Sequence, residues 1–223
     1  GNSKGLRQRI FDGYKNKSGD KPKESYEQFN LLKPMVIDAL KRVGACVVTQ
    51  PHIEADDVIA YLVGGLKGKI TLVTNDGDLS VLLSERVKMW KGGKMIEEHP
   101  FGPFDQKYVR LYKALVGDTS DTYPGAKGFG DQAFLKMAIL FGDEGLDAFV
   151  DLLEKEAAYF WAHHKVSGEW LMTLSEDVAE FKPLGKVLEN IETVVRCWLV
   201  AGLYPDKVNT LRQPLQWQAG MVK

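Results

Sequence analysis

The sequence predicts an α/β protein with a mostly parallel, doubly wound sheet and a helical carboxyl-terminal region. The first observation is a pair of short apolar runs, 45–49 and 69–74, which suit buried strands. The second is that these runs alternate with segments in which apolar residues recur at helical spacing, 25–43 and 54–66. Such alternation favours a parallel sheet covered by helices. The active crevice of such a sheet lies at the carboxyl ends of its strands.

Capping, turn and helix-breaking residues indicate where the elements end. Ser25 suits the start of the first helix and Gly44 its end, while Pro34 indicates a bend or a later start. Gly92-Gly93 predicts a hairpin between strands 87–90 and 94–97. Further helices are expected from residue 79 and over 104–116, 132–141, 146–164 and 189–203, and strand-like residues occur within 210–222.

Composition limits the class of protein. With 223 residues, of which 44% are hydrophobic, the chain can bury one core, with or without a helical appendage. Its net charge of −1 gives no overall signal for nucleic acid, but residues 1–23 hold seven basic and two acidic residues. Such a segment suits phosphates held near a metal site, and a solvated chain end explains it equally well.

Cysteine usage and hydropathy bear on the compartment. Cys46 and Cys197 lie far apart without a CxxC partner, so a disulfide scaffold or a zinc ribbon is excluded and a reducing interior is expected. The sequence has neither an apolar signal-peptide core nor a run of about 18 apolar residues, which predicts no membrane span. We therefore expect a cytoplasmic protein without a membrane partner.

Seven acidic residues fall in three groups. They are Glu54, Asp56 and Asp57, then Asp76 and Asp78, and finally Asp118 and Asp121. Each group alone has a structural explanation, as a helix start, a turn or a cap. If the sheet gathers them, carboxylates about 4 Å apart repel by roughly 4 kcal/mol at an effective dielectric constant of about 20. No His or Cys ligand set accompanies them, so the pattern predicts an all-oxygen site for two Mg²⁺ or Mn²⁺ ions.

A glycine-rich loop follows the last acidic group. Gly125, Gly128 and Gly130 lie between a Pro-Gly turn and an apolar helical run that begins at residue 132. Their spacing matches neither the dinucleotide fingerprint nor a Walker loop, so a nucleotide cofactor is not expected. Bare amides in such a loop can hold a DNA backbone phosphate, with a monovalent cation as a further candidate. A plain corner between two helices is the alternative.

Three segments together resemble the downstream acidic motifs of the 5′–3′ exonuclease and flap endonuclease family, especially its bacteriophage and bacterial polymerase-associated members. They are IEADD at 53–57, TNDGDLSVLL at 74–83 and GDTSDTYPGAKGFG at 117–130, in the family's order and spacing. The resemblance extends from residue 1 to about 141. It implies a PIN-like fold, a helix–three-turn–helix element over 121–141, and two-metal hydrolysis of DNA at 5′ ends or flaps in a bacterial or phage-infected cell.

The resemblance also implies roles for individual residues. Lys15, Asp118 and Asp121 are expected in catalysis, and all seven acids are expected as ligands of two Mg²⁺ or Mn²⁺ ions. Tyr14 would stack on a base near the 5′ end, a contact worth about 1–3 kcal/mol. Contacts with DNA are expected from Arg7, Tyr14, Lys15, Gly125, Lys127, Gly128 and Gly130, with K⁺ as a candidate ion at the loop.

The chain departs from the family pattern in three places. Gly77 stands where many members carry Lys and Ser18 where many carry Arg, so two phosphate contacts are in question. Members also have two further strands upstream, each ending in a metal-site Asp. Three explanations fit the missing strands: the chain is truncated, a separate polypeptide supplies them, or the protein no longer cuts. We expect an amino-terminally incomplete nuclease core over 1–116, the last acidic motif with the helix–three-turn–helix element over 117–145, and a helical region packed on the core over 146–223.

Three other functions compete with this one. A non-catalytic binder of branched DNA, or a subunit without a complete metal site, would keep the glycine loop without cutting. A PIN-type ribonuclease would share the acids, although small ribonucleases of that type generally lack the glycine loop. A phosphatase built on Asp76 and Asp78 fits poorly, because that chemistry places its nucleophilic Asp on the first strand.

Overall fold

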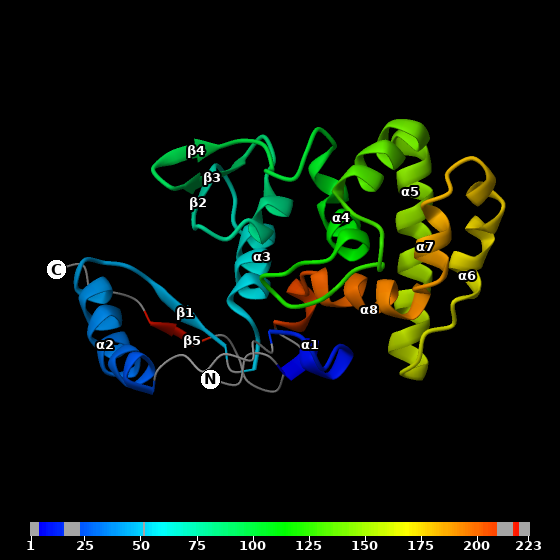
Figure 1. The fold of residues 1–223 in the computed structure, drawn as a ribbon. Coiled ribbons are helices and arrows are strands. Elements are labelled where there is room, and N and C mark those ends of the chain that lie inside the picture. Colours follow the sequence, from blue (N-terminus) through cyan, green and yellow to red (C-terminus); the bar gives the residue numbers. More distant parts are fainter. Residues whose placement is uncertain (1–4, 16–22, 51, 209–215, 219–223) are drawn as a thin grey trace. The chain divides into compact units, whose positions relative to one another are not determined.

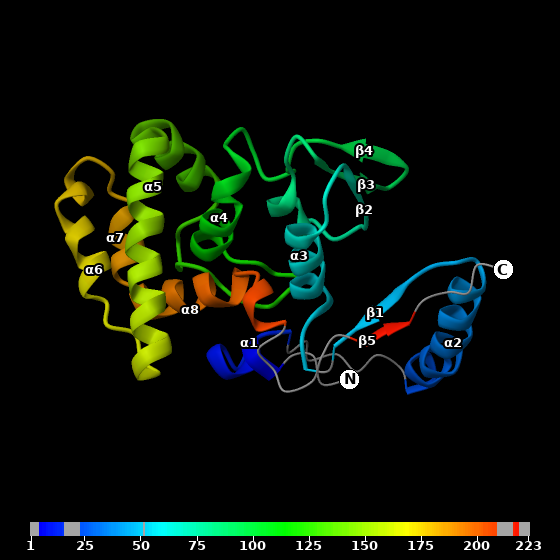
Figure 2. The ribbon, with the colours of Figure 1, turned by 180° about the vertical axis from the view of Figure 1, so that it is seen from behind.

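The computed structural model describes residues 5–15, 23–50, 52–208 and 216–218. The chain separates into two compact units, each of which is described by itself. Unit 1 comprises Gly1–Leu6, Asn16–Gly64 and Leu203–Lys223, and unit 2 comprises Arg7–Lys15 and Gly65–Gly202. Figures 1 and 2 show the ribbon from opposite sides. Ser18, a departure from the family pattern, lies outside the described residues, as do Lys17 and Lys21 of the basic segment.

In its described residues, unit 1 contains two helices and a two-stranded sheet. Its elements are α2 (Lys23–Arg42), β1 (Val47–Thr49), α3 (Ala55–Gly65), a 3₁₀ turn (Pro205–Lys207) and β5 (Gln216–Gln218). β1 and β5 pair antiparallel, with Val47 opposite Gln218. The buried core consists of Ile53, Val58 and Val208, against which Val48, Tyr61 and Leu62 pack. The core thus joins α3 to residues close to the end of the chain.

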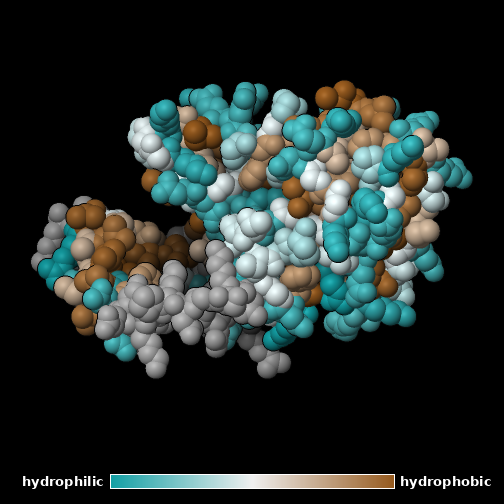
Figure 3. All heavy atoms as spheres, viewed as in Figure 1, coloured by the Kyte–Doolittle hydropathy of each residue, from teal (hydrophilic) through white to brown (hydrophobic). Residues whose placement is uncertain are grey.

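Helix α2 carries an exposed apolar surface. Six of its large apolar side chains are between 45% and 71% exposed, namely Phe29, Leu31, Leu32, Met35, Val36 and Leu40. Figure 3 shows hydrophobic side chains gathered over this helix. A helix usually turns such residues toward a core, so α2 contributes little to the described core of unit 1. Pro34 lies inside the helix and does not mark its start.

Unit 2 contains a three-stranded mixed sheet. β2 (Ile70–Val73) runs parallel to β3 (Val87–Lys91), and β3 pairs antiparallel with β4 (Lys94–Ile96). Gly92 and Gly93 join β3 to β4 with φ angles of 56° and 83°, as a tight two-residue hairpin turn requires. The predicted hairpin is therefore confirmed.

The rest of unit 2 is helical. Its helices are α4 (Val109–Val116), α5 (Asp131–His163), α6 (Glu169–Met172), α7 (Leu184–Leu188), α8 (Ile191–Ala201) and part of α1 (Gly5–Ile10), with 3₁₀ turns at Asp78–Leu82, Gln106–Tyr108, Thr173–Ser175 and Asp177–Ala179. α4 packs against both α5 and α8. Gly142, with φ of 59°, interrupts α5 between the two helices predicted at 132–141 and 146–164.

The predicted α/β class is confirmed, with differences in detail. Among the described strands, β2–β3 is the one parallel pairing, while β1–β5 and β3–β4 are antiparallel, so the sheet is mixed where a mostly parallel one was expected. The runs at 45–49 and 69–74 enter two separate sheets. The helix expected from residue 79 is a 3₁₀ turn, and the helix expected over 104–116 begins at Val109. Short helices such as α1, α6 and α7 escaped prediction because four to six residues show no apolar periodicity. None of the helices in the described ranges combines the length and apolar character needed to cross a bilayer.

The two cysteines differ in their surroundings, which gives a first testable prediction. Cys197 is fully buried and Cys46 is exposed. Burial raises the pKa of the Cys197 thiol to about 12. Near pH 8, where an ordinary thiol is partly ionised, we expect Ellman's reagent to titrate one thiol in the native protein and two after denaturation. Rapid reaction of both thiols in the native protein would contradict the described packing of α8.

A buried carboxylate joins α5 to the segment before α6. Glu156 is 0% exposed, and its carboxylate accepts backbone hydrogen bonds from Ser167 (3.2 Å), Gly168 (3.0 Å) and Trp170 (3.2 Å). In Glu156→Gln, the amide oxygen can keep the contacts with Ser167 and Gly168, but the NH₂ group then faces the Trp170 N–H donor. We expect urea unfolding to record a loss of about 2 kcal/mol. The exposed Glu144→Gln on the same helix should change stability by less than about 0.5 kcal/mol. If both variants lose the same stability, the hydrogen bonds of Glu156 do not hold the segment before α6.

Candidate active site

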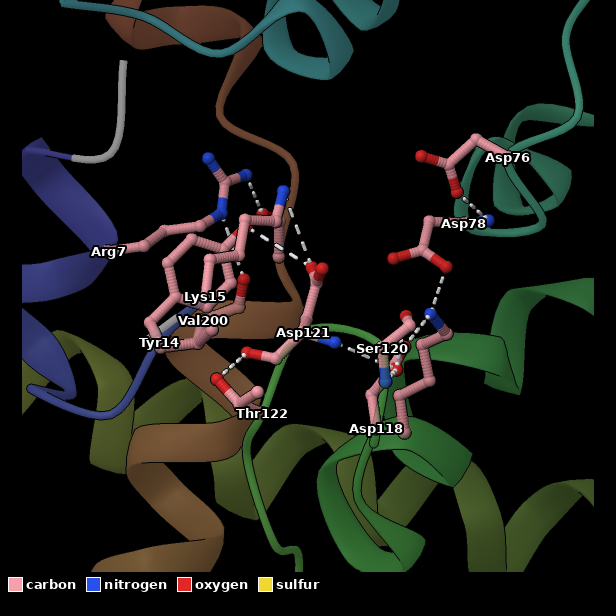
Figure 4. A network of polar contacts seen from close by, with 12 residues as sticks. Arg7, Tyr14, Lys15, Asp76, Asp78, Asp118, Ser120, Asp121, Thr122 and Val200 are labelled. Atoms are coloured by element: carbon pink, nitrogen blue, oxygen red, sulfur yellow. Dashed lines mark hydrogen bonds and ion pairs between the residues drawn. The ribbon is translucent and has the colours of Figure 1, made fainter. Parts of the chain in front are cut away.

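An acidic pocket in unit 2 gathers the second and third acidic groups. It has a volume of about 750 Å³, and its charged lining consists of two lysines, Lys91 and Lys113, and five aspartates, Asp76, Asp78, Asp118, Asp121 and Asp131. Figure 4 shows Asp76 and Asp78, from the turn after β2, facing the loop that carries Asp118 and Asp121. An excess of negative charge in one concave surface favours cations.

A short closed loop fixes Asp118 and Asp121. α4 ends at Gly117, after which Asp118 and Tyr123 exchange backbone hydrogen bonds of 2.8 and 3.1 Å. Asp118 Oδ1 accepts hydrogen bonds from the backbone of Ser120 (2.7 Å) and Asp121 (3.2 Å), and from Ser120 Oγ (2.5 Å). This is the turn chemistry that Asp favours. The second carboxylate oxygen, Oδ2, takes no part in the turn and accepts a hydrogen bond from Lys113 Nζ.

Two glycines let this loop pack against the glycine-rich loop that follows. Gly117 and Gly125 have φ angles of 91° and 65°. A Cβ on Gly117 would lie 2.5 Å from the carbonyl carbon of Pro124, and one on Gly125 would lie 2.4 Å from Gly117 N. Both positions therefore require glycine for close backbone approach. Gly125, which was predicted to contact DNA, has this structural role in addition.

Lys113 is the pocket residue that sequence reasoning missed. The residue lies on α4 and is only 4% exposed. Its ammonium Nζ donates to Asp118 Oδ2 at 2.7 Å and also to Asp78 Oδ1. One buried cation therefore holds two of the predicted metal ligands. The sequence held no clear signal for this residue, because a helical lysine is expected in solvent and the burial of Lys113 depends on its two carboxylate partners.

The shared ammonium leaves the two carboxylates with different proton affinities. Burial raises the pKa of Asp78, and Lys113 offsets this only in part. Burial acts the same way on Asp118, but hydrogen bonds from Lys113 and Ser120 outweigh it, so the pKa of Asp118 is lowered. Burial also disfavours the charge on Lys113, yet the two aspartates raise its pKa overall. Lys113 and Asp118 are thus a stable ion pair at neutral pH.

Asp121 contacts the amino-terminal segment of unit 2. Its Oδ2 accepts a hydrogen bond from the Tyr14 hydroxyl at 3.2 Å and lies 3.5 Å from Lys15 Nζ. The backbone N–H of Lys15 also donates to the Asp121 carbonyl at 2.8 Å. Burial raises the pKa of Asp121, and Lys15 and Tyr14 oppose that shift. Because Tyr14 is only 2% exposed, the base stacking predicted for it would need the segment to move.

Arg7 fastens the same segment to α8. The residue is 4% exposed, and its guanidinium donates to the carbonyls of Val200 (2.9 Å) and Gly202 (2.6 Å). Arg196, on α8, donates in return to the Ile10 carbonyl at 2.7 Å. These contacts give Arg7 a structural role, and the DNA contact inferred from the resemblance stays a prediction.

Two of the other predicted ligands, Asp76 and Asp57, accept backbone hydrogen bonds. Asp76 is exposed, and its Oδ1 accepts from the backbone N–H of Asp78 at 3.0 Å, which is turn chemistry. Glu54, Asp56 and Asp57 stand at the start of α3 in unit 1, where buried Asp57 accepts from the Tyr204 N–H at 2.9 Å. The structure thus brings together the second and third acidic groups, and the joining of the first group to them stays a prediction.

The donor chemistry of the pocket fits a hard divalent cation. Carboxylate oxygens are the ligands that Mg²⁺ and Mn²⁺ prefer, and two lysines do not balance the five aspartates. Among the described side chains, no three His, Cys, Asp or Glu residues are grouped closely enough to hold an ion. The Lys113 ammonium instead bridges Asp78 and Asp118. An ion bound by these two carboxylates would have to share them with this ammonium or displace it.

The glycine-rich loop lines a second pocket of about 710 Å³. Ala126 and Phe129 are buried and anchor the loop, while Lys127 is exposed. Gly128 has φ of 87°, and a Cβ on Gly130 would meet no atom within 4 Å, so the backbone is open there. Asn190 and Thr193 complete the lining. The arrangement presents bare backbone and one lysine on a concave surface.

Comparison with known proteins identifies the relationship. Residues 2–110 match the family described as the 5′–3′ exonuclease, N-terminal resolvase-like domain. Over these residues the chain is similar to the 5′–3′ exonuclease family. It is 33% identical to a 5′–3′ exonuclease of Bacillus subtilis over 149 residues, covering 60% of this chain and 48% of that one. It is 35% identical to DNA polymerase I of Deinococcus radiodurans over 147 residues, covering 62% of this chain and 15% of that one.

Solved structures from bacteriophage T5 share the fold of this chain. The T5 protein co-crystallised with metal ions aligns with a TM-score of 0.63 at 19% identity, over 90% of this chain and 70% of that one. The T5 flap endonuclease in a complex with DNA and metal ions gives 0.64 at 19% identity, over 93% and 74%. The predicted PIN-like α/β fold is therefore confirmed. The chain spans about half the length of the curated exonucleases it matches, 48% and 55% of two of them.

Proposed function

We propose that the chain is a metal-dependent 5′ nuclease that hydrolyses DNA phosphodiesters at 5′ ends or flaps. The observation that carries this proposal is the pocket in which five aspartates outnumber two lysines. Similarity to the 5′–3′ exonuclease family supports it. So does the T5 flap endonuclease, which shares the fold and was solved with DNA and metal ions.

Asp76, Asp78, Asp118 and Asp121 would hold Mg²⁺ or Mn²⁺, and we propose that Glu54, Asp56 and Asp57 complete a site for two ions. Such ions, when bound, activate a water and stabilise the leaving oxygen of a phosphodiester. Lys113 orients Asp78 and Asp118 and favours the ionised form of each. Lys15, 3.5 Å from Asp121, supplies positive charge toward the scissile phosphate.

The proposed DNA contacts lie outside the acidic pocket. Gly125, Lys127, Gly128 and Gly130 would hold a backbone phosphate of the duplex, with K⁺ as a candidate ion. Tyr14 and Arg7 would reach the DNA only if the segment that carries them moves, because both are buried. We also propose that the chain is organised as a nuclease core over 1–116, a DNA-binding element over 117–145 and a helical region over 146–223. A separate polypeptide that supplies the upstream strands is part of the same proposal.

The test is cleavage of a 5′-flap DNA labelled at its 5′ end, with Mg²⁺ or with a chelator. We expect Mg²⁺-dependent release of short labelled products and weaker activity on single-stranded RNA of the same sequence. Preference for the RNA would favour a PIN-type ribonuclease. Absence of cleavage by the chain, alone and with a polypeptide that supplies the upstream strands, would refute the proposal.

A non-catalytic binder of branched DNA is the second candidate. It is favoured by the Lys113 bridge between Asp78 and Asp118, which balances part of their charge without a metal ion. Tight binding of flap DNA without turnover at any Mg²⁺ concentration would support this candidate, and robust turnover by the chain alone would exclude it.

A further inference from the structure

We propose that Lys186, on the short helix α7, forms part of the phosphate-binding surface of the glycine-rich loop. Its ligand would be a backbone phosphate of duplex DNA. This inference rests on the proposed function and deepens it, because it gives a role to the carboxyl-terminal region, which lies beyond the residues 2–110 that match the family.

The first support is the position of the Lys186 side chain. A Cβ on Gly128 would lie 3.6 Å from Lys186 Cδ and 3.8 Å from its Cγ. The aliphatic stem therefore lies beside Gly128, which lines the pocket of about 710 Å³. A lysine that packs its stem in this way keeps its ammonium in solvent, and the Lys186 side chain is half exposed.

The second support is that the segment around α7 is fixed to the loop. The Phe181 ring meets Phe129 of the loop edge-to-face, with centroids 6.5 Å apart, and meets Phe141 in the same way at 6.0 Å. Asn190, which lines the pocket, donates its side-chain amide to the Lys186 carbonyl at 2.7 Å. Lys186 is thus held beside the loop by packing on both sides of α7.

The third support is that the ammonium has only a weak competitor. Lys186 Nζ lies 2.8 Å from Glu189 Oε2, and the two side chains are 49% and 62% exposed. Ion pairs this exposed contribute little, so a phosphate can replace the carboxylate at small cost. Two lysines and open amides around one concave surface then form a site for an anionic backbone.

The experiment measures binding of a duplex with a 5′ flap by fluorescence anisotropy, in chelator so that no cleavage occurs. Lys186→Met keeps the stem over Gly128 and removes the charge. We expect its affinity to fall about three- to tenfold, and the slope of log Kd against log salt to fall by about 0.9, the value for one phosphate contact. Glu189→Gln should bind more tightly than the unmodified chain, because it removes the competing carboxylate.

The controls separate this inference from the proposed function. Lys155→Met, at an exposed position of α5 and not among the neighbours of Gly128, removes the same charge. Its affinity should stay within twofold of the unmodified chain, and its salt slope should not change. Lys186→Arg should restore binding. If the duplex binds but Lys186→Met matches Lys155→Met, the role of Lys186 is refuted while the proposed function stands. If no duplex binds to the unmodified chain, the proposed function itself fails.

Discussion

Asp118→Asn is expected to lower the rate of 5′-flap cleavage by at least about 10³-fold, which corresponds to roughly 4 kcal/mol. Hydrogen bonds from Lys113 and Ser120 lower the pKa of Asp118 in spite of its burial, so its carboxylate is charged at neutral pH. Asparagine has the same shape and can keep the contacts that Oδ1 accepts from Ser120 and Asp121. The substitution removes the negative charge. It also places an NH₂ group either against the Lys113 ammonium or against the N–H donors of Ser120 and Asp121.

The measurement is the single-turnover cleavage rate at saturating Mg²⁺, with a thermal melt to establish that the variant is folded. Asp151→Asn, an exposed position on α5, makes the same chemical change away from the pocket and should keep the rate within about twofold. A folded Asp118→Asn protein that cuts at the unmodified rate would remove Asp118 from the mechanism.

Lys113→Met is expected to lower the free energy of unfolding by about 3 kcal/mol in the presence of chelator. The ammonium is buried and faces two carboxylates, so its removal leaves Asp78 and Asp118 without their cation. Breaking a buried ion pair by removing one partner usually costs about 3–5 kcal/mol. The lower end applies here because the Asp78 side chain is 30% exposed.

Urea unfolding measures this loss, and two comparisons assign its cause. Lys136→Met, on the exposed side of α5, should change stability by less than about 0.5 kcal/mol. Adding Asp78→Asn to Lys113→Met should recover part of the loss, because one uncompensated charge disappears. Mg²⁺ should stabilise Lys113→Met more than the unmodified chain if the ion occupies the same carboxylates. A loss below about 1 kcal/mol would mean that the bridge is not an important contact.

Local signals predicted much of the fold. The Gly92-Gly93 turn predicted the hairpin, and the break between two apolar helical runs predicted the interruption of α5 at Gly142. The pairing of β1 with β5 joins residues more than 160 positions apart, so local patterns could not specify it. Sequence reasoning placed Asp76 and Asp78 after a strand, which is where the structure has them.

The sequence predicted the acidic residues of the site but not the buried cation, Lys113. Periodicity treats a lysine on a helix as solvated, and the burial of Lys113 follows only once Asp78 and Asp118 are seen on both sides of it. The burial of Arg7 likewise depends on carbonyls 193 and 195 positions away in the sequence. Motif spacing carries no information about such contacts, because it records the order of residues and not their neighbours in space.

Direct titration of Mn²⁺ into the DNA-free chain by isothermal calorimetry tests the central claim, that the acidic pocket is a site for divalent cations. The account predicts saturable binding by the unmodified chain and its loss in the doubly substituted Asp118→Asn/Asp121→Asn protein. Asp151→Asn serves as the matched control and should bind as the unmodified chain does. Undiminished binding by the double variant, or no saturable binding by the unmodified chain at millimolar Mn²⁺, would contradict it.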